Sequence, residues 1–250
     1  MPTIPTFAVV GAVNHGKSSA VAALLEDDTV RISPMPGETV DNKRFALRDK
    51  LILFDTPGFQ NARKTLAQID RAEAGDDPLR TFARFIETHR DDPDFDAECR
   101  LLQPIVDGAG IIYVVDGSKP LRDINLCEME ILRLTAAPRL AIINRTDDED
   151  HVDAWKSRLD QHFNIVRVFD AHHATHADRR DLIESLASIE RGWKDSLHQA
   201  ADLIDAERDN RAIDAAALVV ELIAYCLRHA ESARVDAAMG AADRDAAVAR

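Results

Sequence analysis

The sequence predicts an α/β fold in which a mostly parallel sheet is wrapped by helices. The first observation is a series of short apolar runs bounded by Gly, Pro, Asp or Asn, which is typical of strands buried on both faces. The second is that stretches of helical periodicity lie between these runs, as expected of parallel strands joined by crossover helices. The predicted buried strands are FAVVGAV (7–13), KLILFDT (50–56), AGIIYVVDGS (109–118), PRLAIIN (138–144) and NIVRVFDA (164–171).

A sixth strand is predicted at NKRFALR (42–48), where polar and apolar residues alternate more weakly. It lies just before the run 50–56, so we expect an edge strand that is antiparallel to its neighbour. The sheet is therefore predicted to have six strands. Helical periodicity predicts flanking helices at 17–26, 123–135, 151–162 and 178–192.

Residues 59–108 contain no clear strand, and a connection of this length is unusual between two strands. TLAQIDRAEA (65–74) and DPLRTFARFIETHR (77–90) are helix-like pieces. We therefore predict a helical insertion over 59–108, and the simplest interpretation is a helical lid on the core. The apolar residues at helical spacing in the second piece are Leu79, Phe82, Phe85 and Ile86.

After residue 192 the strand pattern stops, and the chain becomes rich in Ala, Leu, Ile and charged residues with no Pro. This predicts a first domain over 1–190 and an α-helical extension over 191–250. Between 215 and 227 only Glu221 is charged, a run too short to span a bilayer and better suited to packing against partners. The end of the sequence lacks a closing core element, so we expect it to be the front of a longer protein.

The composition favours a cytoplasmic protein. The net charge of −13 argues against a nucleic-acid surface over the whole chain, and residues 191–250 hold 11 acids and 8 bases with no GXXG loop. No apolar run is long enough to span a bilayer, so membrane contact is not expected. Three widely separated cysteines exclude a disulfide framework, since an odd number cannot all pair.

A glycine-rich turn, GAVNHGKSS (11–19), separates the first predicted strand from the first helix. It fits the pattern G-x4-G-K-[ST], in which backbone N–H groups wrap phosphates, Lys17 reaches the β and γ oxygens and Ser18 binds Mg2+. The alternative is a glycine turn with an exposed lysine. The predicted nucleotide contacts of this turn are Asn14, His15, Gly16, Lys17, Ser18 and Ser19.

A second motif, DTPG, ends the predicted strand 50–56. Asp55 at the end of a buried strand can reach a water on Mg2+, and the Gly58 N–H can contact a γ-phosphate. This motif therefore predicts a sensor of the triphosphate. Taken alone, an aspartate at a strand end is commonplace.

A third motif, NRTD, comprises Asn144 to Asp147 and follows the strand PRLAII. A carboxylate at Asp147 can accept both hydrogens from the N1 and N2 edge of guanine, which adenine does not offer. The motif thus favours GTP over ATP. The alternative is an ordinary Asn-Asp turn.

These three motifs, in this order and each after a strand, resemble the motif series of small GTPases, most closely the TrmE-Era group. The resemblance covers about residues 5–190 and implies a P-loop GTPase domain that binds GTP or GDP with Mg2+. The family pattern at the base site is N-K-x-D, and Arg145 stands here in place of the lysine.

Two further correspondences follow from the resemblance. MPGETVD (35–41) is similar to the first switch segment, which makes Thr39 the hydroxyl that joins Mg2+ when a γ-phosphate is present. A Pro-Gly turn that leads into a strand is the alternative. The family's final Ser-Ala motif is represented by Asp170 and Ala171, with the Ala171 N–H directed at the guanine oxygen.

The position that many GTPases fill with a water-orienting glutamine is Phe59 here. A phenyl ring cannot hold water, so either Gln60 substitutes or another element supplies the function. Some members of the TrmE-Era group use a potassium ion held partly by a phosphate-loop asparagine, the position of Asn14. A potassium-assisted mechanism is therefore predicted, and the alternative is slow hydrolysis until a partner provides an arginine.

The sequence thus predicts a GTP-binding switch with hydrolase activity. Its rivals are a nucleotide-gated scaffold with negligible hydrolysis and an ATP-dependent phosphotransferase. An unidentified protein partner is also expected, with a nucleotide-dependent dimer as one form. His15 is expected to point to solvent, and the run His172, His173 and His176 to rim the base pocket, with a zinc site as the alternative. The predicted catalytic set is Lys17, Thr39, Gly58 and Asn14, and the predicted metal ligands are Ser18, Thr39 and Asp55.

Overall fold

The structure is a computed structural model that describes residues 4–12, 15–25, 31–32, 43–69, 77–145 and 151–228. The side chains of residues 31, 32 and 207 lie outside this description. The chain divides into two compact units, Met1–Leu203 and Ile204–Arg250, which are treated separately below. The first residues of the predicted helical extension therefore belong to the first unit.

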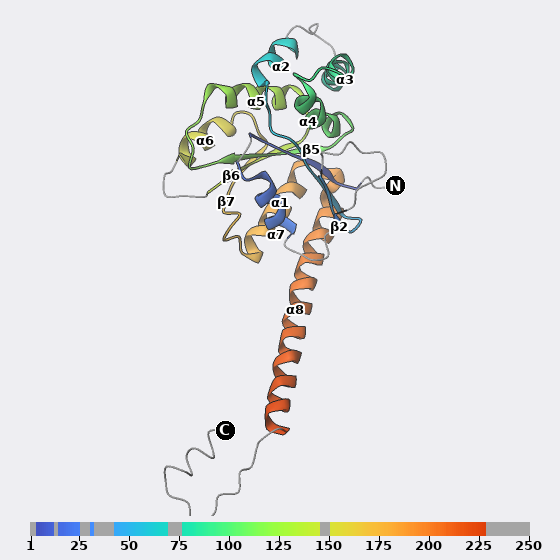
Figure 1. Cartoon of the computed structure of the whole chain (residues 1–250), viewed down its shortest axis with the longest axis vertical. Helices are drawn as coiled ribbons and strands as arrows, with labels where there is room; N and C mark the ends of the chain where they lie inside the picture. The colour runs from blue at the N-terminus through green and yellow to red at the C-terminus, as the bar shows by residue number, and fades with distance from the viewer. Residues whose placement is uncertain are drawn as a thin grey trace, which may run out of the picture. The chain divides into compact units, whose positions relative to one another are not determined.

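The predicted α/β fold is confirmed (Figure 1). The sheet has the order β2-β3-β4-β1-β5-β6-β7, in which β1 pairs in parallel with β4 and β5, and β5, β6 and β7 continue in parallel. The predicted edge strand β3 is antiparallel to β4, as expected, and a seventh, two-residue strand β2 pairs with its outer side. The strands are β1 (Thr6–Val10), β2 (Arg31–Ile32), β3 (Lys43–Leu47), β4 (Leu51–Asp55), β5 (Gly110–Asp116), β6 (Arg139–Asn144) and β7 (Ile165–Phe169).

The four predicted flanking helices are also present, with ends that differ from the expected ones by up to three residues. Local capping explains two of the starts: Asp77 accepts the Leu79 N–H before α3, and Thr175 and Asp178 form a capping box before α7. The described helices are α1 (Lys17–Leu25), α2 (Ala62–Ile69), α3 (Pro78–His89), α4 (Asp96–Val106), α5 (Asp123–Leu134), α6 (Val152–Leu159), α7 (His176–Ile189), the 3-10 turn η1 (Arg191–Trp193) and α8 (Lys194–Arg228).

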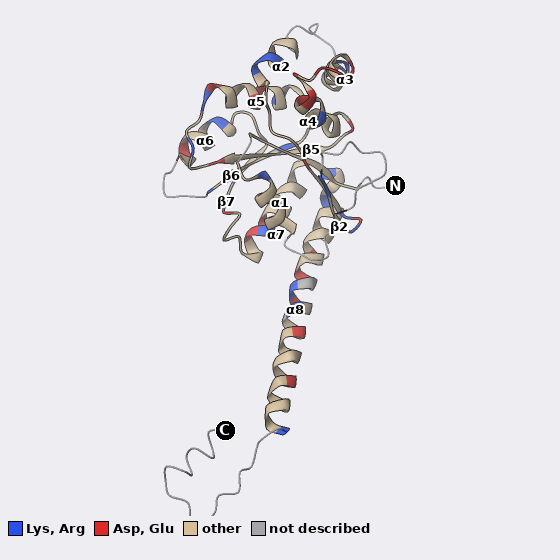
Figure 2. Ribbon diagram, viewed as in Figure 1, with Lys and Arg blue, Asp and Glu red and all other residues tan. Residues whose placement is uncertain are grey.

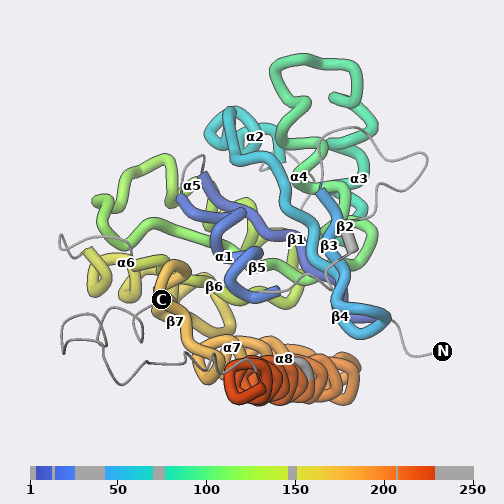
Figure 3. Tube along the Cα trace, turned by 60° about the horizontal axis from the view of Figure 1, so that its bottom comes forward, coloured from blue at the N-terminus to red at the C-terminus, as the bar shows by residue number. Residues whose placement is uncertain are grey.

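Helices cover both faces of the sheet (Figures 1 and 3). The helices α2 to α6 lie over the face that carries Ala8, Ile111 and Tyr113, and together they bury an extensive apolar core. The helices α1 and α7 pack on the opposite face, where the ring of Trp193 meets Phe7 edge-on at 4.9 Å. This double covering explains why every residue of β5 is buried.

The predicted insertion over 59–108 contains α2, α3 and α4. Phe82, Phe85 and Ile86 of α3 are buried in the main core, whereas Leu79 remains partly exposed. The helix α4 packs against α3 and against β1. The insertion is therefore continuous with the core of the domain.

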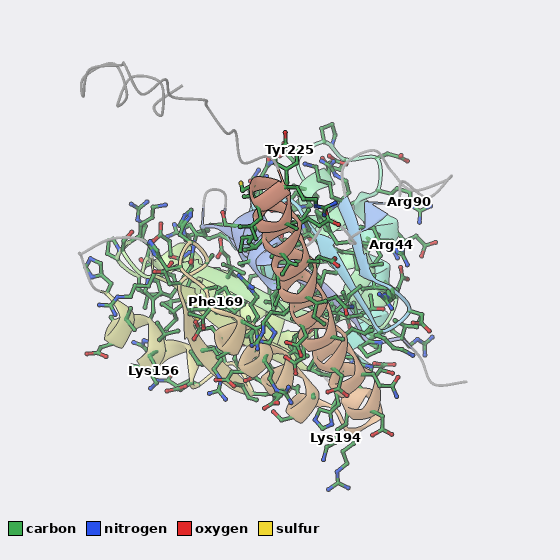
Figure 4. All side chains as sticks on the ribbon, turned by 90° about the horizontal axis from the view of Figure 1, so that it is seen from below. Arg44, Arg90, Lys156, Phe169, Lys194 and Tyr225 are labelled. Carbon is green, nitrogen blue, oxygen red and sulfur yellow. The ribbon has the colours of Figure 1, made fainter. Side chains whose placement is uncertain are left out.

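The second unit begins within α8 at Ile204. Apolar side chains of this part of the helix are exposed, and Tyr225 on its last turns projects from the ribbon (Figure 4). Charged residues are sparse along these turns (Figure 2). Within the described ranges, no helix is long and apolar enough to cross a membrane. The predicted packing of residues 215–227 against partners stays a prediction. The exposed apolar residues of this unit are Ile213, Leu218, Val219, Val220, Leu222, Ile223, Tyr225 and Leu227.

Candidate nucleotide-binding site

Most of the predicted site residues that the structure describes gather where the parallel strands end. The segments after β1, β4, β5, β6 and β7 all leave the same edge of the sheet, because these strands run in one direction. A pocket of about 380 Å³ opens there. Its lining residues are His15, Gly16, Lys17, Ser18, Ser19, Asp116, Asn144 and His172.

Both glycines of the G-x4-G pattern occupy positions that only glycine fits. Gly11 has a φ of 146°, and a Cβ there would lie 2.2 Å from the backbone oxygen of Val114. Gly16 has a φ of 85°, and its Cβ would lie 2.3 Å from Nδ2 of Asn144. The phosphate loop is thus packed against both β5 and the end of β6.

Lys17 is the first residue of α1, and its ammonium group turns back over the loop. Its Nζ donates to the carbonyl oxygens of Gly11 at 3.2 Å and Ala12 at 3.0 Å. Burial lowers the pKa of Lys17, while the nearby Asp55 carboxylate opposes this shift. The ammonium therefore has backbone partners that a phosphate can replace with stronger, charge-assisted ones.

Ser18 and Asp55 lie together as predicted for metal ligands. The Ser18 hydroxyl donates to Oδ2 of Asp55 at 2.7 Å. Thr56, the next residue, donates from its hydroxyl to the Val9 carbonyl at 2.8 Å, which ties the end of β4 to β1. A hydroxyl and a carboxylate are hard oxygen ligands, so this pair fits Mg2+ with waters and phosphate oxygens completing the shell.

The residues after Asp55 are held firmly. Gly58 is buried, and the Phe59 side chain is only 7% exposed because it joins the core beneath α2 to α6. The Gln60 residue next to it is exposed. Phe59 therefore serves packing, in keeping with the prediction that it cannot orient water.

The predicted base side of the pocket joins two segments of the chain, the end of β6 and the residues around the end of β7. Asn144 is 1% exposed, and its Oδ1 accepts the Ala171 N–H at 3.2 Å. Arg145 is exposed, and its backbone N–H donates to the Phe169 carbonyl. In the described chain, the Ala171 N–H predicted to contact guanine is thus directed at Asn144.

The histidine-rich segment after β7 forms a turn around Asp170. The carboxylate of Asp170 accepts the backbone N–H groups of His172 and His173, and it also pairs with Nδ1 of His173 at 2.9 Å. His172 lines the pocket, which agrees with a loop at its rim. No three His, Cys, Asp or Glu side chains of the described residues are grouped to hold a metal ion, so the zinc interpretation finds no support there.

The prediction that His15 points to solvent is wrong. Its side chain is 9% exposed, and its ring meets that of Trp155 edge-on at 6.4 Å. Burial, followed by the charge of Lys119, lowers the pKa of His15 to about 4. Its Nδ1 has no hydrogen-bond partner among the described residues. The loop turns this ring inward because α6 supplies an aromatic wall behind it.

Sequence reasoning missed two residues near His15, namely Asp116 of the pocket lining and Trp155 behind the histidine ring. Asp116 ends β5, and its carboxylate accepts from the Ser118 hydroxyl at 2.6 Å and from Lys119 Nζ at 2.8 Å. Trp155 donates its ring N–H to the Lys119 carbonyl. Asp116 was recognisable as a carboxylate at the end of a buried strand, whereas the position of Trp155 depends on how α6 packs.

Three predicted site residues lie outside the described residues. They are Asn14 of the phosphate loop, Thr39 of the first switch segment and Asp147 of NRTD. Their predicted roles rest on the sequence.

Two family models match the chain. One, described as 50S ribosome-binding GTPase, matches residues 6–145, and the other, a domain of unknown function (DUF3482), matches residues 156–250. A search of curated proteins found no match. The first match covers more than half of the chain and contains the phosphate loop, DTPG and the start of NRTD.

Several solved structures are similar at low identity. Era in complex with MgGDPNP and nucleotides of 16S ribosomal RNA is 16% identical, with a TM-score of 0.47, over 76% of this chain and 57% of that one. A GTP-binding protein from the archaeon Sulfolobus solfataricus in complex with GDP is 18% identical, with a TM-score of 0.37, over 80% and 53%. The G domain of the T. maritima FeoB iron transporter is 19% identical, with a TM-score of 0.38, over 79% and 99%. The chain thus spans little more than half the length of Era.

Proposed function

The chain belongs to the family of 50S ribosome-binding GTPases, and from this membership we propose that it is a GTP-binding switch that hydrolyses GTP to GDP and phosphate with Mg2+. The observation that carries the proposal is the pairing of Ser18 with Asp55 at 2.7 Å, beside Lys17, at the edge where the parallel strands end. A lysine, a hydroxyl and a carboxylate in this arrangement fit a Mg2+-bound triphosphate.

Each residue has a distinct task in this proposal. Lys17 leaves the Gly11 and Ala12 carbonyls and binds the β and γ oxygens, where it neutralises charge that develops during phosphoryl transfer. Ser18 ligates Mg2+, and Asp55 holds a water on the ion. The loop amides of His15, Gly16 and Ser19 wrap the phosphates. Mg2+ held by these residues would offset the negative charge of the phosphates.

The switch between the GTP and GDP states is proposed to depend on the groups that contact the γ-phosphate. Thr39 and the Gly58 N–H contact it only in the GTP state, so hydrolysis releases the segments that carry them. The Phe59 side chain is packed in the core and cannot orient water, and Gln60 beside it is exposed. We therefore propose that Asn14 would help to hold a potassium ion, which would supply this function when bound. The alternatives are Gln60 and an arginine supplied by a partner.

Hydrolysis by the purified full chain tests this proposal. GTP turnover is measured with Mg2+ in potassium and then in sodium, with wild type, Asn14→Ala and Lys17→Ala side by side. We expect faster turnover in potassium, loss of that difference in Asn14→Ala, and no turnover in Lys17→Ala. Equal and negligible turnover of the wild type in both salts, with GTP still bound, favours the nucleotide-gated scaffold instead.

Guanine recognition is proposed to come from Asp147 through the N1 and N2 hydrogens, with the stem of Arg145 packing on the base. Asp170 and Ala171 are proposed to close the same side of the pocket, where the Ala171 N–H donates to Oδ1 of Asn144. The rival function, an ATP-dependent phosphotransferase, requires the pocket to bind adenine nucleotides at least as tightly as guanine nucleotides.

The partner of the switch is proposed to be a protein, with a nucleotide-dependent dimer as one form. Direct binding of nucleic acid is not expected, since the net charge of −13 repels phosphate. The family description names the ribosome, so this expectation needs a direct test. Co-sedimentation of the GTP-loaded chain with 50S subunits and with naked ribosomal RNA tests it. Binding to the subunits alone indicates a ribosomal protein as partner, binding to the naked RNA contradicts the expectation, and binding to neither excludes a ribosomal partner.

A further inference from the structure

A carboxylate far from the phosphate loop in sequence reaches the segment that follows Gly58. Glu98, in the first turn of α4, is fully buried, and its Oε1 accepts the backbone N–H of Gln60 at 2.7 Å and that of Asn61 at 2.5 Å. Burying a glutamate is costly unless hydrogen bonds replace its water. These two amides satisfy Oε1, whereas Oε2 is buried with no hydrogen-bond partner among the described residues. Because the amides are the only hydrogen bonds found for this buried group in the described chain, the position of α4 and the path of the backbone at 60–61 depend on each other.

The same two parts of the chain are joined a second time beside Glu98. The Asn61 side chain donates to the Asp94 carbonyl at 2.6 Å, and Lys64 pairs with the Asp94 carboxylate at 2.9 Å. The Lys64 pair is exposed and adds little by itself. The contacts through Glu98 and Asn61 therefore carry the connection between α4 and the start of α2.

These contacts hold the backbone close to the proposed γ-phosphate contact. Gly58 lies two residues before Gln60, and Phe59 between them is anchored in the core. On the other side of Gly58, the Thr56 hydroxyl is bound to the Val9 carbonyl. The peptide that presents the Gly58 N–H is thus fixed on both sides. Thr56 and Phe59 are held by the core, and Glu98 holds the backbone that follows them.

We propose that Glu98 is a positioning residue of the nucleotide site, which holds the backbone at Gln60 and Asn61 so that the Gly58 N–H faces the γ-phosphate. This inference rests on the proposed function, because it assumes that Gly58 reads the γ-phosphate. GDP has no such phosphate, so loss of the anchor weakens GTP binding and leaves GDP binding in place. It also couples the γ-phosphate to α4 and hence to the insertion.

Two substitutions separate the hydrogen bonds from the charge. In Glu98→Gln the amide oxygen can still accept both N–H groups, whereas in Glu98→Asp the shorter side chain keeps the charge and loses the reach. Asp96→Ala, an exposed acid on the same helix, is the matched control. The readout is the ratio of affinities for a non-hydrolysable GTP analogue and for GDP, with a melting curve to show that each variant is folded.

We expect Glu98→Asp to lower this ratio about tenfold, the effect of losing one or two hydrogen bonds to a carboxylate. Glu98→Gln is expected to stay within about threefold of wild type, and Asp96→Ala to match it. A ratio unchanged in Glu98→Asp, or equal losses of GTP-analogue and GDP affinity, overturns the inference and makes Glu98 a structural brace only. If the wild type binds neither nucleotide, the proposed function itself fails, which the first titration reveals.

Discussion

Two side chains near the site, Lys17 and Glu98, both form hydrogen bonds with the backbone, but in opposite ways. The ammonium of Lys17 donates to two carbonyls of its own loop, only five and six residues away. The carboxylate of Glu98 accepts two amides from a segment 37 and 38 residues away. The first arrangement is local and joins a partly buried lysine to its own loop, and the second is long-range and involves a fully buried glutamate.

This difference indicates which contact changes when nucleotide binds. Lys17 can leave its carbonyls for phosphate oxygens, since those oxygens carry charge and bind an ammonium more strongly. Glu98 has no such replacement within the described residues, and leaving its amides would strand a buried carboxylate. We therefore expect Lys17 to exchange its hydrogen-bond partners when nucleotide binds, and Glu98 to keep its own.

The largest expected effect comes from removing the exchangeable group. Lys17→Ala should weaken binding of both GTP and GDP about 100-fold or more, because two charge-assisted hydrogen bonds to phosphate are lost. Titration of a fluorescent nucleotide measures this. Arg63→Ala, at an exposed arginine near the start of α2, is the matched control and should bind as wild type does. Unchanged affinity in Lys17→Ala would show that the lysine keeps its loop carbonyls.

A comparable effect is expected at the base. Asp147→Asn replaces one of two acceptor oxygens by an N–H donor that opposes the guanine edge, so GDP affinity should fall about 100-fold. Xanthine, which presents an oxygen at that edge, should be bound better by the variant than by wild type. Competition of GDP with xanthosine diphosphate checks both statements. If the variant prefers GDP as strongly as wild type does, Asp147 does not contact the base.

A smaller effect is expected at the metal. Ser18→Ala removes one oxygen ligand and leaves Asp55 in place, so about ten times more Mg2+ should be needed for half-maximal nucleotide binding. GDP titrations at several Mg2+ concentrations measure it. Ser118→Ala removes a hydroxyl bonded to Asp116 and serves as the control. Equal Mg2+ requirements in wild type and Ser18→Ala would exclude the serine as a ligand.

The smallest effect concerns stability and pH. Burial lowers the pKa of His15 to about 4 in the folded chain, against an ordinary value of 6.5. Between these two pH values the imidazole is protonated in the unfolded chain but neutral in the folded chain, so the folded chain loses stability as the pH falls. The free energy of unfolding should therefore fall by about 1–2 kcal/mol between pH 7 and pH 5 and level off below about pH 4. His15→Gln should lose this part of the slope. Urea unfolding of both proteins at several pH values tests it, and identical slopes would mean that His15 is not buried as described.

The fold and much of the site could be predicted because their signals are local. The strand runs, the helical spacing and the glycines at 11 and 16 are properties of short segments, and the structure agrees with them. The resemblance to small GTPases is confirmed at the level of the family, and the helical region after residue 192 coincides with part of a second family match. The pairing of Ser18 with Asp55 followed from motif order, since parallel strands end at one edge.

The rest could not be predicted because it depends on packing between distant segments. Nothing local to His15 shows that Trp155 of α6 will lie behind it. Similarly, Glu98 belongs to an acidic stretch that suggests a solvated surface, yet it is buried because α4 lies against the start of α2. The seventh strand β2 has only two residues, too few to give a periodic signal.

Calorimetric titration of the full chain with GDP and with ADP, both in Mg2+, tests most directly whether this pocket is a guanine-nucleotide site. The account predicts saturable binding of GDP that is about 100-fold tighter than that of ADP, since only guanine offers two N–H groups to a carboxylate. Equal affinities for the two nucleotides, or no binding of either, would contradict it.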